Sequence, residues 1–122
     1  MRKLRRNIKK RFNIEHREYD IKGRLVYYRD KIDTEMFITY DNGKQVHCKK
    51  ADGSEYWRDY DERGNLIHYK NSNGFEYWKQ YNEFDVCIHY KNSKKLEEWY
   101  NDRGELYRCK FPDGTEEFYN VD

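Results

Sequence analysis

A pattern of about 21 residues recurs five times along this chain. The copies start at Tyr19, Tyr40, Tyr60, Tyr81 and Tyr100. The clearest copy reads YDERGNLIHYKNSNGFEYW from Tyr60 onward. A unit this short cannot bury a face by itself, so the period indicates a repeat protein whose units stack on their neighbours.

Each copy predicts two short strands joined by a tight turn. Segments rich in Tyr, Trp, Ile and Val lie between Gly, Asn and Asp residues, which is typical of strands and turns. In Asn71–Gly74 the glycine stands where a three-residue hairpin loop needs a left-handed residue. That loop places Lys70 opposite Glu76 and His68 opposite Trp78, and opposite charges at such positions contribute about 0.2–1 kcal/mol per pair.

The connection between hairpins is harder to assign. Asp61–Gly64 and Asn101–Gly104 are typical of return turns. The same three-residue loop there would turn successive repeats to opposite faces, because side chains alternate along a strand. The sequence therefore leaves this second register open.

These patterns predict a mainly β fold, a single elongated, twisted antiparallel sheet of about five tandem β-hairpin repeats over residues 19–122. A short basic N-terminal helix or arm over residues 1–18 precedes it. Leu, Ile, Val and Phe number only 22 of 122 residues, but thirteen Tyr and three Trp add apolar area. We expect a folded protein with a thin core.

The N-terminal arm is strongly basic. Its first twelve residues contain seven cations, Arg2, Lys3, Arg5, Arg6, Lys9, Lys10 and Arg11. The rest of the chain holds 18 basic and 23 acidic residues, and Leu4, Ile8 and Phe12 share the spacing of one helical face. Three interpretations stay open: a cap on the first edge of the sheet, a site for nucleic acid or an acidic protein, and attachment to a membrane surface.

The chain contains no apolar run long enough for a secretory signal or a membrane span. Its three cysteines are odd in number, and Cys48 and Cys109 occupy one repeat slot about three hairpins, or about 29 Å, apart. That separation excludes a disulfide between them. We expect a cytoplasmic protein with no membrane partner.

The residues do not predict catalysis. His47, His68 and His89 recur in one slot, but equivalent residues of successive hairpins lie about 9.6 Å apart. Zinc needs each imidazole nitrogen at about 2.0–2.1 Å, so a half-exposed histidine against a tryptophan is the better interpretation. Nucleophile-elbow, phosphate-loop and HExxH patterns are not found. We therefore predict no enzyme, catalytic residue, metal or cofactor.

The opening Tyr-Asp-x-x-Gly, a short strand, a second glycine turn and an aromatic strand together resemble the YD (RHS-like) repeats of bacteria, and more loosely MORN-type hairpin repeats. The resemblance covers about residues 19–119. Large YD-repeat proteins enclose or present toxins, but this chain is too short to form a shell, so only the hairpin pattern carries over. Asp85 in a glycine slot and Lys94–Lys95 in a turn depart from the pattern.

The function predicted from these features is a non-catalytic protein-binding module. Trp57, Trp78 and Trp99 form an aromatic-rich candidate binding face, although a core role is the competing interpretation of these large apolar side chains. The expected partner is a bacterial nuclease or toxin, which fits a small inhibitor, an antitoxin-like protein, or a phage or mobile-element anti-defence (anti-CRISPR-like) protein. The alternative is a nucleic-acid-binding protein that uses the basic arm and stacking aromatics.

Overall fold

The computed structural model describes residues 15–30 and 34–121, where no helix is present and, within each compact unit, neighbouring strands pair antiparallel. The chain divides into two compact units at Glu55, each of which is described by itself. The first unit contains β1 (His16–Tyr19), β2 (Leu25–Arg29), β3 (Glu35–Asp41) and β4 (Lys44–Lys50). The second contains β5 (Glu55–Tyr60), β6 (Leu66–Asn71), β7 (Glu76–Tyr81), β8 (Cys87–Asn92), β9 (Glu97–Tyr100), β10 (Leu106–Lys110) and β11 (Glu116–Phe118).

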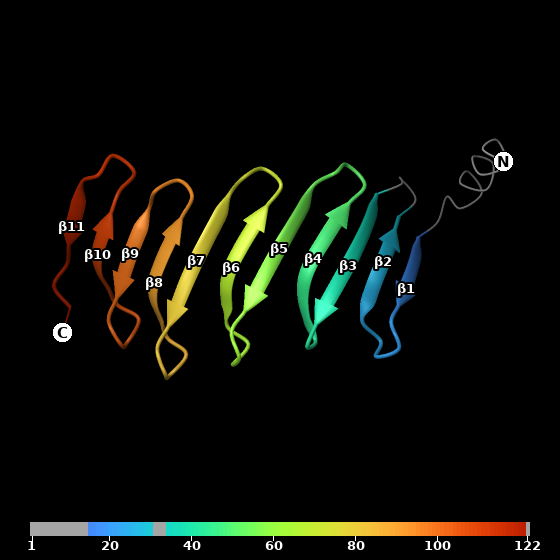
Figure 1. The fold of residues 1–122 in the computed structure, drawn as a ribbon, viewed down its shortest axis with the longest axis horizontal. Coiled ribbons are helices and arrows are strands. Elements are labelled where there is room, and N and C mark those ends of the chain that lie inside the picture. Colours follow the sequence, from blue (N-terminus) through green and yellow to red (C-terminus); the bar gives the residue numbers. More distant parts are fainter. Residues whose placement is uncertain (1–14, 31–33, 122) are drawn as a thin grey trace. The chain divides into compact units, whose positions relative to one another are not determined.

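Within each unit the strands lie side by side in chain order (Figure 1). The prediction of a mainly β fold built from tandem antiparallel hairpins is therefore confirmed. Residues 16–18, placed in the predicted basic arm, belong to β1, where Glu18 lies opposite Tyr27. The predicted N-terminal helix falls outside the described residues.

The hairpin turns have the predicted geometry. The Asn71 amide donates to the Phe75 carbonyl at 3.0 Å, and the Gly74 amide donates to the Asn71 carbonyl at 3.1 Å. Gly74 has φ +88°, in the left-handed region that favours glycine. The resulting register pairs Lys70 with Glu76, as the sequence predicted.

Four return turns, which begin at Asp20, Asp61, Asn82 and Asn101, use the same loop, whereas the turn between β3 and β4 is a two-residue turn with Asn42 and Gly43 both at positive φ. In every copy a β-bulge resolves the register that the sequence left open. The Asp61 amide donates to the Asn65 carbonyl at 2.9 Å. In the following strands Tyr60 lies opposite Leu66, while Asp59 lies opposite His68, so Ile67 is an extra residue on β6. One extra residue shifts the side-chain alternation by one, which returns each repeat to the same face. The same slot is bulged in the other copies, at Val26, Val46, Ile88 and Tyr107.

The core is as thin as the composition predicted. Among the described residues, Ile38, Cys48 and Cys109 are the buried hydrophobic side chains. All three cysteines carry free thiols.

Tyrosines form a second packing layer on one side of the β5–β11 unit. Tyr56 and Tyr69 have ring centroids 6.1 Å apart, Tyr69 and Tyr77 5.1 Å, and Tyr77 and Tyr90 5.6 Å. The Tyr81 hydroxyl donates to the Leu66 carbonyl at 2.9 Å, which ties β7 to the start of β6. These contacts occupy the face opposite the tryptophans, because Tyr77 precedes Trp78 directly on a strand.

Candidate partner-binding face

The three tryptophans predicted to bind a partner lie on one face of the β5–β11 unit. Trp57 lies opposite Lys70, and Lys70 lies opposite Glu76, which is two residues from Trp78. Trp78 lies opposite Lys91, which pairs with Glu97, two residues from Trp99. Residues opposite each other or two apart on a strand share a face. Phe118 joins this face through Arg108, which lies opposite both Trp99 and Phe118. We call the face of this unit that carries Trp57, Trp78, Trp99 and Phe118 the tryptophan face.

The tryptophans of this face are partly open to solvent. Trp57 is 38% exposed, Trp78 is 37% exposed and Phe118 is 70% exposed, while Trp99 is half-buried. These side chains therefore do not form the buried core of the fold. They are surface aromatics on regular strands.

The flat sides of Trp78 and Trp99 are covered by neighbouring strands. His68 stacks on Trp78 with centroids 5.5 Å apart at 20°, and the Lys91 Nζ lies 5.6 Å from the centroid of the same ring. His68 comes from β6 and Lys91 from β8, which flank β7. The ring is thus held between two side chains, and its edge is what reaches solvent.

Trp99 is held in the same way with one change of residue. His89 lies against it at 5.5 Å, and the guanidinium carbon of Arg108 lies 4.0 Å from its ring centroid on the other side. Arg108 is also 5.7 Å from the Phe118 ring, so one cation lies between two aromatics. Cation–π contacts of this kind contribute about 0.5–1 kcal/mol at exposed sites.

In each repeat, the residue eight positions before the glutamate is a hydrogen-bond partner of that glutamate. His68 Nε2 lies 2.6 Å from Glu76 Oε2, and His89 Nε2 lies 2.8 Å from Glu97 Oε2. In the last copy Arg108 Nε donates to Glu116 at 2.8 Å. The sequence predicted Lys70 opposite Glu76, and the structure confirms this pair and the equivalent pairs Lys91–Glu97 and Lys110–Glu116. The close side-chain contact of each of these glutamates is nevertheless with the His or Arg diagonal to it.

The first unit repeats this arrangement. His47 Nε2 lies 2.6 Å from Oε2 of Glu55, which is the last residue of this unit and the first of β5. The Tyr27 hydroxyl donates to Glu35 at 2.5 Å, and burial together with this hydrogen bond raises the pKa of Tyr27 to about 12. Phe37, 48% exposed, occupies the tryptophan slot and lies 5.1 Å from the Tyr27 ring.

His68 has carboxylates on both ring nitrogens. Its Nδ1 lies 3.0 Å from Asp59 Oδ2, in addition to the Glu76 contact on Nε2. Burial lowers the pKa of His68, but the hydrogen bonds to Asp59 and Glu76 outweigh it, so the pKa lies above its ordinary value. A doubly protonated ring donates to both carboxylates, which fixes its plane against Trp78.

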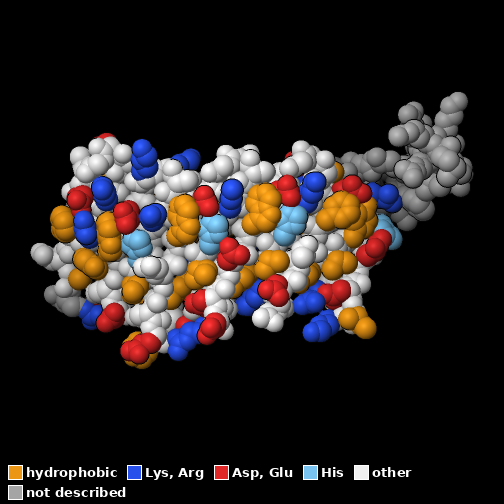
Figure 2. Space-filling view, viewed as in Figure 1, with side chains coloured by type: hydrophobic (Ala, Val, Ile, Leu, Met, Phe, Trp, Pro, Cys, Tyr) orange, Lys and Arg blue, Asp and Glu red, His pale blue; other side chains and the backbone are white. Residues whose placement is uncertain are grey.

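The face seen in Figure 2 carries hydrophobic, histidine, acidic and basic side chains close together rather than in separate patches. On the tryptophan face, Lys70, Lys91, Arg108 and Lys110 accompany Asp59, Glu76, Glu97 and Glu116. Opposite charges are thus balanced across this face. Such a surface suits a partner with its own mixed charges better than a uniform polyanion.

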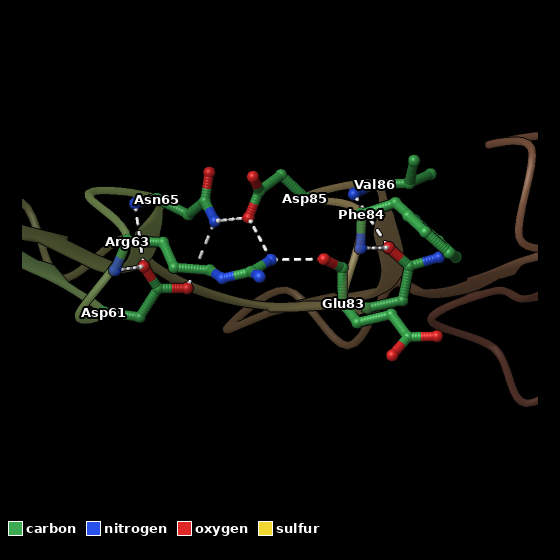
Figure 3. Close-up of polar contacts among 8 residues, drawn as sticks. Asp61, Arg63, Asn65, Glu83, Phe84, Asp85 and Val86 are labelled. Carbon is green, nitrogen blue, oxygen red and sulfur yellow. Dashed lines mark hydrogen bonds and ion pairs between the residues drawn. The ribbon is translucent and has the colours of Figure 1, made fainter.

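A second feature, which the sequence did not reveal, joins two successive return turns of the β5–β11 unit (Figure 3). Arg63 donates to Asp85 Oδ1 at 3.0 Å and to the Glu83 carbonyl. The Asn65 side-chain amide donates to the same Asp85 oxygen at 2.9 Å. Asp85, with φ +64°, replaces the turn glycine of other copies. The departure noted in the sequence is thus a polar link between hairpins, which we call the turn link.

The basic part of the predicted site cannot be compared with the structure. The basic residues Arg2, Lys3, Arg5, Arg6, Lys9, Lys10 and Arg11 lie outside the described residues. Across residues 15–30 and 34–121, no group of three or more His, Cys, Asp or Glu is arranged to hold a metal ion. The same part of the chain has no helix long and apolar enough to cross a membrane.

Comparisons with known proteins identify the fold only. The sequence matches no protein-family model, and the search of curated proteins finds no match. Among solved structures, the chain is similar to crystal structures of TcdB2-TccC3-Cdc42, TcdB2-TccC3-TEV and TcdB2-TccC3, with TM-scores of 0.62, 0.64 and 0.61. Identity is 16%, 16% and 17%, and each match covers 79% of this chain. The chain spans about 5% of the length of those chains. The likeness shows a shared β-hairpin repeat fold.

Proposed function

We propose that this protein is a non-catalytic binding module that docks a partner protein on its tryptophan face. The observation that carries the proposal is the bracing of Trp78 and Trp99 by His68, Lys91, His89 and Arg108. Braced aromatic side chains lose little conformational freedom on binding, and Trp is enriched among residues that dominate interface energy. The module thus presents fixed aromatic edges flanked by charges of both signs.

The partner that we propose is a bacterial nuclease or toxin, with the module acting as an inhibitor, antitoxin-like or anti-defence (anti-CRISPR-like) protein in the cytoplasm. A small chain that presents a binding face and carries no recognised catalytic motif fits inhibition by occlusion. Trp edges with balanced charge suit a folded protein surface.

Nucleic-acid binding through the basic arm is the alternative. The seven cations of residues 2–11 favour it. The stacking part of that alternative has less support, because bases stack on open ring faces, and both sides of Trp78 and Trp99 contact neighbouring side chains.

The test is affinity capture from host cells, identification of the captured protein, and direct titration of the purified pair. Trp78→Ala should weaken binding about 30-fold, the equivalent of about 2 kcal/mol for an interface anchor. Phe84→Ala is the matched control, because Phe84 is a 72% exposed aromatic on the return turn between β7 and β8 and not on a strand of this face. Melting of each variant checks that the fold is intact.

Equal affinities for Trp78→Ala and wild type would contradict the proposal. So would tight, salt-sensitive nucleic-acid binding that disappears when Arg2, Lys3, Arg5 and Arg6 are replaced by Gln, with no protein captured by either form. That outcome would support the alternative.

A further inference from the structure

A small hollow opens beside the tryptophan face, at the turn end of β8–β11. Its volume is about 290 Å³. Its lining includes Lys91, Lys95, Leu96, Lys110, Phe111 and Pro112. This volume lies at the lower limit of pockets for small-molecule ligands, so it suits one or two side chains of a peptide. We call it the lysine hollow.

Lys91, Lys95 and Lys110 form no salt bridge within the described part of the chain. Lys91 lies opposite Glu97 in the sheet. Glu97 also lines the hollow, and Glu97 and Glu116 lie opposite Lys110 in the sheet. Both carboxylates are engaged elsewhere, Glu97 by His89 and Glu116 by Arg108.

Lys95 occupies a backbone position that disfavours lysine. Its φ is +69°, whereas Gly53, Gly74 and Gly114 fill the same slot in other hairpin turns with φ of 89°, 88° and 90°. An L residue in the left-handed region is strained, and strained residues cluster at functional sites. Glycine would relieve the strain but would remove one ammonium group from the hollow.

We propose that the lysine hollow binds an acidic, partly apolar segment of the partner protein. The partner's carboxylates lie over Lys91, Lys95 and Lys110, and an adjoining aliphatic side chain contacts Leu96 and Phe111. Charge complementarity selects the acidic segment, and the apolar lining favours a peptide over a nucleic-acid backbone. This inference rests on the proposed function and names the chemistry that the partner presents.

The test uses the full-length protein and a fluorescent peptide, Asp-Leu-Glu-Asp-Leu-Glu, with Asn-Leu-Gln-Asn-Leu-Gln as its neutral counterpart. Fluorescence anisotropy measures affinity at low and moderate salt. Lys95→Gly combined with Lys110→Gln should weaken binding of the acidic peptide about tenfold, from two exposed charge contacts. Lys50→Gln, an exposed lysine on β4, is the control and should leave affinity unchanged.

Several outcomes overturn the inference. They are equal binding of the acidic and neutral peptides, no effect of the Lys95→Gly and Lys110→Gln pair, and tighter Lys95-dependent binding of a six-nucleotide single strand than of the peptide. Because Lys95→Gly relieves the left-handed strain, we expect the variant to stay folded, and its urea midpoint checks that a loss of binding is not a loss of folding.

The two proposals fail separately. A captured partner whose affinity depends on Trp78 but not on Lys95 or Lys110 leaves the proposed function standing and removes this inference. A partner that is insensitive to all three residues removes both.

Discussion

Substitution of Gly74 tests whether the repeat is built on left-handed hairpin turns. Gly74 has φ +88°, and a β-carbon added there would meet no atom within 4 Å. The cost of Gly74→Val therefore comes from the backbone conformation and not from a steric clash with neighbours. For an L residue in this region the penalty is about 1–2 kcal/mol, and a β-branched side chain lies toward the upper end.

The matched control is Asn73→Ser, one residue earlier in the same turn. Asn73 contributes its backbone amide, which donates to Asn71 Oδ1 at 3.0 Å, and a serine keeps that amide. An exposed substitution of this kind changes stability by less than about 0.5 kcal/mol. The two variants thus differ mainly in the conformation demanded of the backbone.

The assay is urea unfolding followed by tryptophan fluorescence, with the free energy of unfolding and its denaturant dependence fitted for each variant. We expect the order wild type, Gly74→Asn, Gly74→Ala, Gly74→Val from most to least stable, because Asn tolerates positive φ better than Ala or Val. Equal midpoints for Gly74→Val and Asn73→Ser would show that residue 74 does not adopt the left-handed conformation in solution.

Four further measurements test individual contacts. The raised pKa of His68 adds stability that is complete below about pH 6.5 and is lost as pH rises through the folded-state pKa. The urea midpoint should therefore fall less steeply between pH 6 and pH 8.5 in His68→Gln than in wild type. The same pH dependence in both proteins would refute this. Asp85→Ala should lower the unfolding free energy by about 1–2 kcal/mol, because alanine keeps the positive φ without the polar contacts of Asp85. Arg63→Gln should lower it by at most about 1 kcal/mol, because it removes only an exposed ion pair. Equal losses in the two variants would contradict the strain argument. Tyr81→Phe removes a part-buried hydroxyl donor and should cost about 1 kcal/mol in chemical denaturation, against no change if that bond does not form. Lys95→Gly should raise the unfolding free energy by about 1 kcal/mol at most, and a clear loss of stability would show that its backbone is not strained.

The hairpins were predictable from sequence because their turns contain residue types that specify a turn. Asn71 and Gly74 specify a loop of fixed length, and the loop fixes the pairing of Lys70 with Glu76. The bulge at Ile67 has no such residue type, because a β-branched residue is equally typical of a regular strand position. The return register therefore needed the structure.

The candidate site was predictable in part for a similar reason. The repeat places Trp78 and Trp99 in one slot, which was sufficient to predict a common face. Arg108 stands in the histidine slot by sequence, but it also lies opposite Trp99, where a lysine lies opposite Trp78, and this depends on β9 being shorter than β7. A contact selected by strand length cannot be read from residue types alone.

The turn link was missed because it joins residues far apart in sequence. Arg63 and Asp85 are 22 positions apart, and each belongs to a different return turn. Residue patterns within one repeat describe the repeat itself. They do not show which side chains of successive repeats meet.

The turn link also affects how the β5–β11 unit unfolds. In a tandem array, stability is approximately the sum of an intrinsic free energy for each repeat and a coupling free energy for each junction. Arg63, Asn65 and Asp85 add coupling at one junction through side chains, beyond the backbone ladder that all junctions share. Fraying that begins at the short strand β11 should proceed inward until it reaches this junction, and hydrogen exchange would then show β6 and β7 opening together as one cooperative segment.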